Sequence, residues 1–104
     1  LKGLELGCSG CISAVTNVTH SLAKKVFDDF KNGREQTVNS KLIKVRETFD
    51  NYQLISALHS FLSIENKKYE NILPPLKLLS KEKQKQLIST LKQQNFLPNK
   101  NIAA

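Results

Sequence analysis

Lysine is the most frequent residue of this chain whose side chain can act as a nucleophile. Fourteen lysines and two arginines stand against nine acidic residues, which gives a formal net charge of +7. A lysine amine attacks carbonyl groups when burial or a neighbouring cation lowers its pKa. The one apolar, β-branched run, Cys11 to Thr16, contains no lysine, and the lysines fall instead on expected helices and exposed connectors. None of them is placed for that chemistry.

The two cysteines, Cys8 and Cys11, form a C-x-x-C pair. A thioredoxin-like redox pair follows a strand and begins a helix, whereas this pair precedes the expected strand. A zinc site needs two further ligands at short spacing, and His20 and His59 are too scattered to supply them. We therefore interpret the pair as coincidental and predict no metal and no cofactor. Two thiols without other cysteines fit a reducing cytoplasm.

The remaining titratable residues suggest structural roles. We expect His20 to lie beside a helix start and His59 to be a packed or half-exposed residue of an apolar helix, because neither stands in a catalytic constellation. Asp28–Asp29 follows Lys24–Lys25 by four positions, which predicts surface ion pairs along one helix.

The basic charge also permits a different class of function, a small basic helical module that binds nucleic acid. Phosphates are neutralised by lysine and arginine, but sequence readout relies on arginine and single-strand binding on exposed aromatic residues. The lysines here are spread over several segments, and arginines are few. We therefore expect a solvated surface and no nucleic-acid partner. The sequence contains no run of 18 apolar residues, so it predicts no membrane span.

The periodicity predicts a mostly α-helical chain with one strand. The strand is expected at residues 11–16, after a helix that ends at Gly7. Four helices should follow, at about 19–33, 38–49, 53–64 and 81–94, with Gly33 ending the first and Ser80 capping the last. A lone strand cannot satisfy its own backbone hydrogen bonds. Because the sequence also opens on Leu1 inside a helix, we expect a piece of a larger protein.

Several segments resemble the dihydrodipicolinate synthase/N-acetylneuraminate lyase family, in the same order and at the same spacing. The run from Gly7 to Asn17 is similar to the last barrel strand of that family, which commonly reads G-x-x-G-[VC]-I-S with an Asn a few residues on. Phe30–Gly33 matches an F-x-x-G helix end, and Ile72–Ser80 resembles R-x-P-L-x-x-L-S before the final helix. The resemblance runs from residue 1 to about residue 97.

The chain departs from the family pattern at Asn51–Ala57. The family often has N-P-x-P-x-K there, and both prolines and the lysine are replaced in this sequence. The departure leaves the barrel assignment in place but puts the substrate in doubt. The resemblance is strongest to dihydrodipicolinate synthase, and 2-keto-3-deoxy-sugar-acid aldolases and N-acetylneuraminate lyase-type enzymes remain alternatives.

The resemblance implies the C-terminal fragment of a TIM (β/α)8 barrel. Residues 1–17 would hold the end of a barrel helix and the last barrel strand, residues 18–97 a helical C-terminal region, and residues 98–104 a flexible tail. It also implies a cytoplasmic homo-oligomer that acts on pyruvate and an aldehyde, as in lysine biosynthesis.

The family joins or cleaves these substrates through an imine on a strand lysine, with a tyrosine that relays protons. Both residues lie on earlier strands, upstream of Leu1, so we expect no catalytic residue here and predict that this piece alone is inactive. Gly10, Ile12 and Ser13 match family positions that line the pyruvate pocket. The alternative for Ile12 is packing within a layer of the barrel.

Overall fold

A computed structural model describes residues 1–96 of the chain, and every element in it is helical. Between residues 1 and 96 there is no β-strand. The five α-helices and one 3-10 helix, in chain order, are α1 (Lys2–Glu5), α2 (Thr16–Lys31), α3 (Asn39–Asp50), α4 (Leu54–Ser63), η1 (Lys67–Glu70) and α5 (Lys81–Gln93).

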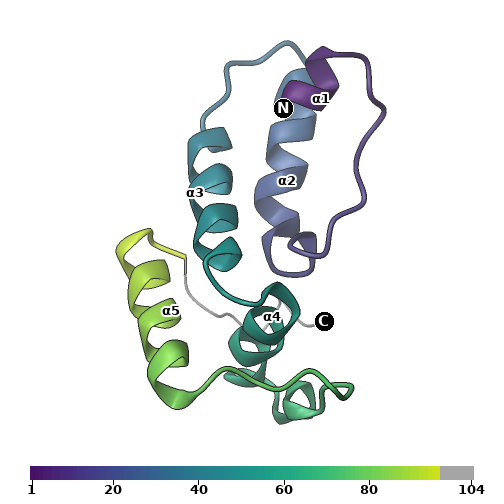
Figure 1. The fold of residues 1–104 in the computed structure, drawn as a ribbon. Helices are drawn as coiled ribbons and strands as arrows, with labels where there is room; N and C mark the ends of the chain where they lie inside the picture. Colours follow the sequence, from purple (N-terminus) through teal and green to yellow (C-terminus); the bar gives the residue numbers. More distant parts are fainter. Residues whose placement is uncertain (97–104) are drawn as a thin grey trace.

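The helices are arranged in two groups (Figure 1). In the upper group α2 and α3 lie side by side, and the segment from Leu6 to Val15 descends along the outer side of α2. In the lower group α4 contacts α2, α3, α5 and η1, so it is the central helix of the fold. A helix that is apolar over most of its circumference needs neighbours on more than one side, and α4 has them.

The core lies where α3, α4 and α5 meet. Phe49 and Phe61 are fully buried, and their rings meet edge to face with centroids 5.6 Å apart. Phe96, just after α5, stacks on the other side of Phe61 at 5.7 Å. Leu87 and Leu91 fill the remaining side from α5. The helices expected at about 38–49, 53–64 and 81–94 are thereby confirmed as α3, α4 and α5.

The strand expected at residues 11–16 is not formed. Residues 11–13 are extended without a partner strand, and Thr16 already belongs to α2. The backbone N–H groups of Thr16, Asn17 and Val18 donate to the carbonyl three residues earlier, at 3.1–3.2 Å. The β-branched composition was misleading because strand preference depends on cross-strand neighbours, which residues 1–96 do not provide.

The start of α2 also differs from the expectation. The helix begins at Thr16, so it runs across the boundary drawn between residues 17 and 18, and it has a kink at Thr19 (φ −114°, ψ 16°). Its N-cap is Val15, which makes no side-chain capping hydrogen bond. The Thr19 hydroxyl instead donates to the carbonyl of Val15 at 3.0 Å, a local bond that competes with helix geometry.

The helix ends expected at Gly7 and Gly33 are confirmed by the backbone conformation of these glycines. Gly7 and Gly33 have positive φ angles of 97° and 63°, a region that glycine enters without steric cost. The tail expected at residues 98–104 lies outside the described residues. Among residues 1–96, no helix has the length and apolar character needed to cross a membrane.

Loss of the Ser80 cap should weaken α5. The Ser80 hydroxyl accepts a hydrogen bond from the backbone N–H of Lys83 at 3.3 Å. We expect Ser80→Ala to lower the free energy of unfolding by about 1 kcal/mol, because it leaves one first-turn donor without its partner. Urea unfolding followed by circular dichroism measures this, and Ser80→Asp, which also caps, serves as the control. Equal stability of the two variants would contradict the capping role.

Candidate functional site

The three residues predicted to line a substrate pocket lie on the extended segment before α2. Ile12 and Ser13 border a cavity of about 1030 Å³, whose opposite wall includes Leu42 of α3 and Leu54 of α4. Gly10 is not part of this wall, and a Cβ at its position would meet no atom within 4 Å. Ile12 is fully exposed at 105%, so it forms the rim of an open groove. The structure thus brings Ile12 and Ser13 together but leaves Gly10 apart.

No lysine among residues 1–96 is buried. Lys41 is the most enclosed of them, half-buried, and its Nζ donates a hydrogen bond to the carbonyl of Asn95 at 3.0 Å. The lysine that lines the cavity beside Ile12 and Ser13 is Lys2, which is exposed on α1. A nucleophilic lysine needs desolvation or a neighbouring cation, and burial provides it to none of these side chains.

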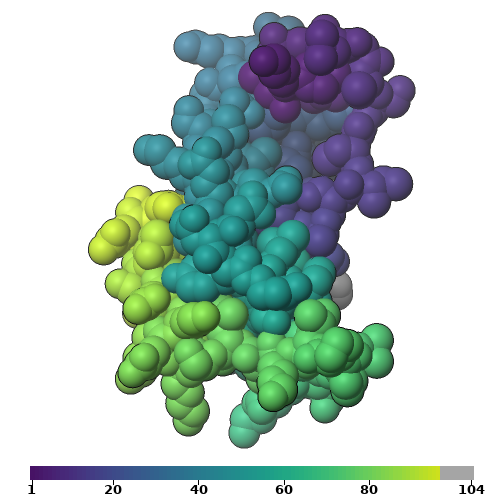
Figure 2. All heavy atoms as spheres, in the orientation of Figure 1, coloured from purple at the N-terminus to yellow at the C-terminus, as the bar shows by residue number. Residues whose placement is uncertain are grey.

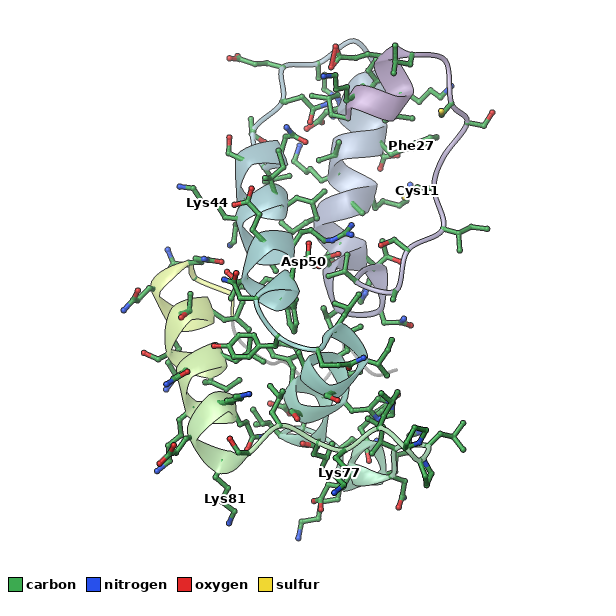
Figure 3. The ribbon with its side chains drawn as sticks, in the orientation of Figure 1. Cys11, Phe27, Lys44, Asp50, Lys77 and Lys81 are labelled. Carbon is green, nitrogen blue, oxygen red and sulfur yellow. The ribbon has the colours of Figure 1, made fainter. Side chains whose placement is uncertain are left out.

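The two cysteines and the two histidines are spread over the extended segment, α2 and α4. Cys8 and Cys11 are free and exposed, and Cys11 lies on the outlying segment (Figure 3). His59 is half-buried, and its Nδ1–H donates to the carbonyl of Tyr69 at 2.8 Å, which makes it a packing residue. His20 is exposed on α2. Within residues 1–96, no group of three metal-ligating side chains gathers.

The ion pairs on α2 are not equivalent, which the sequence did not reveal. Lys24 and Asp28 pair at 2.9 Å on the surface, as expected. Asp29 is 1% exposed, and it pairs with Lys25 at 2.8 Å and with the Arg34 Nε at 3.6 Å. The backbone N–H of Arg34 also donates to the Asp29 carbonyl at 2.7 Å. The expectation of a surface pair at Asp29 is wrong, because the turn after α2 folds back over this carboxylate.

A second hollow, here called the connector groove, lies between the α3–α4 turn, residues 77–80 and the first turns of α5. Its volume is about 590 Å³. The side chains that matter chemically are Tyr52, Gln53, Ser56, Lys77, Lys83 and Gln86. None of its lining residues is acidic. This groove could not be predicted from local sequence patterns, because Ser56 and Lys77 are far apart in the chain.

Hydrogen bonds from α4 hold the walls of the connector groove in place. The Ser60 hydroxyl, on buried Ser60, accepts the backbone N–H of Leu79 at 3.0 Å. The Ser60 carbonyl accepts from Gln84 Nε2, also at 3.0 Å. The connector and α5 are thereby fixed against α4, and Figure 2 shows these green segments directly against the teal α3–α4 region.

Comparison with known proteins assigns the family. The sequence matches the model of the dihydrodipicolinate synthetase family over residues 1–94. No curated protein and no solved structure matches the chain. The matched region includes the extended segment, every helix from α1 to α5, and the residues that line both hollows. The chain therefore belongs to the dihydrodipicolinate synthetase family, whose members are TIM-barrel aldolases and lyases.

Proposed function

We propose that this chain is the C-terminal part of a pyruvate-dependent Schiff-base lyase or aldolase, most like dihydrodipicolinate synthase. In this proposal, residues 11–16 form the last barrel strand when the other strands are present, and α2 to α5 pack outside and after the barrel. Family membership supports the proposal, and so does the state of the extended segment.

The observation that carries the proposal is the unsatisfied segment before α2. The backbone N–H groups of residues 9–13 donate no hydrogen bond to backbone carbonyls of residues 1–96. Ile12, an apolar side chain, is fully exposed within the same segment. Pairing with a neighbouring strand would satisfy these donors, and burying an isoleucine side chain contributes roughly 1.5–3 kcal/mol. The segment is therefore suited to a place inside a sheet.

The chemical role of these residues would be to form a wall of the substrate site. Ligand-binding residues of a TIM barrel lie at the C-terminal ends of the strands and in the loops that follow. Gly10, Ile12 and Ser13 would line the pyruvate pocket, and their small or apolar side chains leave room for an imine. The nucleophilic lysine and the proton-relaying tyrosine would come from other strands of the enzyme, which we propose to be a homo-oligomer in the cytoplasm.

The aldehyde substrate is the open part of the proposal. Tyr52, Leu54 and Ser56 stand where the family pattern has its two prolines and lysine. This departure keeps 2-keto-3-deoxy-sugar-acid aldolase and N-acetylneuraminate lyase activities as candidates beside dihydrodipicolinate synthesis. Release of pyruvate from each sugar acid by the complete enzyme distinguishes the cleavage activities from the synthase.

Covalent trapping tests the assignment of the lysine. With pyruvate and borohydride, the complete enzyme should gain the mass of one reduced pyruvate per subunit, on a lysine outside residues 1–96. The 104-residue chain alone should gain none, because its described lysines are not desolvated. Intact-mass and peptide mass spectrometry measure both, with borohydride alone as the control. A single saturable adduct on any lysine of residues 1–96 would contradict the proposal that the nucleophilic lysine lies outside these residues.

A further inference from the structure

We propose that Cys8 and Cys11 form a reversible disulfide, with a low-molecular-weight disulfide such as glutathione disulfide as the oxidant. Both thiols are free and exposed, and Figure 3 shows Cys11 on the segment that lies apart from the helices. An oxidant can therefore reach either sulfur from the solvent. Protein disulfides in a reducing cytoplasm are usually transient and redox-sensing, so a reversible pair suits the compartment proposed above.

The surroundings of the pair differ from those of a thioredoxin-like motif. Such a motif follows a strand and begins a helix, and Cys8 and Cys11 do not have that context. A reversible disulfide needs less, namely two accessible sulfurs that the backbone can bring together. In residues 1–96 no strand is formed at 11–16, so no ladder of hydrogen bonds holds Cys11 in place.

The backbone between the two sulfurs is free to turn. The backbone N–H of Cys8 donates to the carbonyl of Gly3 at 2.9 Å, which fixes Cys8 to α1. Residues 9–12 make no backbone–backbone hydrogen bond within residues 1–96, as donors or as acceptors. A Cβ at Gly10 would meet no atom within 4 Å, so the tip of a turn has open space. Cys11 can therefore approach an anchored Cys8.

The spacing of the two cysteines matches that of a β-turn. Three residues of extended chain span roughly 10 Å, whereas a disulfide needs Cα atoms about 4.4–6.8 Å apart. A β-turn brings its first and fourth Cα atoms within about 7 Å. Ser9 and Gly10 would take the two central positions, and a type II turn favours glycine at the second of these. Oxidation therefore requires this segment to change from extended to turned.

The exchange proceeds in two balanced steps. The thiolate of one cysteine attacks a sulfur of glutathione disulfide, which forms a mixed disulfide and releases one glutathione thiolate. The thiolate of the other cysteine attacks the protein sulfur of that mixed disulfide, which closes the Cys8–Cys11 bond and releases the second glutathione. Two protein thiols are oxidised, one glutathione disulfide is reduced to two thiols, and the two protons pass to them through the solvent. Excess reduced glutathione reverses both steps.

The turn competes with the barrel strand, a consequence that rests on the proposed function. Cys11 lines the cavity of about 1030 Å³ together with Ile12 and Ser13. A strand needs an extended backbone, and a turn closed at Cys11 bends the chain where the strand at 11–16 would begin. It also displaces Gly10 from the course that leads into the strand. The reduced chain can therefore complete the wall of the pyruvate pocket, and the oxidised chain cannot.

Equilibration of the 104-residue chain with mixtures of reduced and oxidised glutathione tests the disulfide. After acid quenching and alkylation, intact-mass spectrometry should show the loss of two hydrogens and no alkylated thiol, with peptides linked through Cys8 and Cys11. Cys8→Ser and Cys11→Ser should each give only a mixed disulfide with glutathione. Ser9→Pro should raise the ratio of disulfide to dithiol about threefold, because proline presets the φ angle at this turn position.

Three results with the 104-residue chain would overturn the proposal. The first is two stable glutathione adducts on one chain, and the second is linkage between chains in place of linkage within them. The third is an unchanged ratio of disulfide to dithiol in Ser9→Pro, which would exclude the turn.

Trapping of pyruvate on the complete enzyme tests the consequence for the pocket. In oxidised glutathione the borohydride adduct should be lost, and dithiothreitol should restore it. Cys8→Ser should form the adduct in both buffers, because it lacks the second sulfur. Equal trapping of the unmodified enzyme in both buffers would contradict the competition with the strand. Absence of trapping in the reduced enzyme would instead contradict the proposed lyase function, and the disulfide of the 104-residue chain is measured independently of it.

Discussion

Replacement of Phe61 by alanine should lower the free energy of unfolding by about 3–5 kcal/mol. Phe61 has no exposed surface, and its ring lies between Phe49 and Phe96, at centroid distances of 5.6 and 5.7 Å. The substitution removes both aromatic contacts and leaves a cavity where α3, α4 and α5 meet. Since small domains are stable by only about 5–15 kcal/mol, this loss removes a large share of the free energy of unfolding.

The comparison with Phe27→Ala separates core packing from a general loss of aromatic surface. Phe27 is half-buried on α2, outside the central cluster, with the Lys31 Nζ 5.7 Å from its ring centroid. Its replacement should cost about 1 kcal/mol, because less apolar area is lost. Equilibrium urea unfolding measures both variants. If they proved equally destabilised, the core would not be centred on Phe61.

The second large effect is expected at Asp29. Asp29→Asn should lower the free energy of unfolding by about 2 kcal/mol, because it removes two charge-assisted contacts from a carboxylate that is 1% exposed. The loss should be smaller than that of a fully buried pair, since Lys25 and Arg34 are 50% and 60% exposed and keep their hydration.

Asp28 provides the matched control on the same helix. Its pair with Lys24 has the same spacing, but the two side chains are 40% and 72% exposed. Asp28→Asn should therefore change stability by less than about 0.5 kcal/mol. Urea unfolding of both variants, repeated at high salt, checks the difference, and the effect at Asp29 should persist because a buried carboxylate is screened less. Similar losses at both positions would mean that the burial of Asp29 has no energetic consequence.

Both effects concern the helical part of the molecule, which is internally well packed. The extended segment before α2 is the opposite case, with free backbone donors and an exposed Ile12. This contrast supports the proposal that the segment finds its partners in the rest of a barrel. The helices would then position that strand.

Features that depend on local spacing could be predicted from the amino-acid sequence. The stripes of α3 and α5 place Val45, Phe49, Leu87 and Leu91 on one helix face each, and all four are fully buried. Helix ends could be predicted too, because a capping serine acts within a few residues of the chain. The family resemblance was also a local property, carried by short motifs in order, and the family match confirms it.

Contacts between distant segments could not be predicted in this way and are known only from the three-dimensional structure. A strand depends on neighbouring strands, so residues 11–13 are extended but unpaired, and Thr16 begins α2, when residues 1–96 offer no other strand. The burial of Asp29 depends on the path of the chain after α2, and the connector groove brings Ser56 to Lys77 and Lys83. The periodicity of apolar residues indicates which face of a helix is apolar. It cannot predict which polar residues from separate helices will line the same hollow.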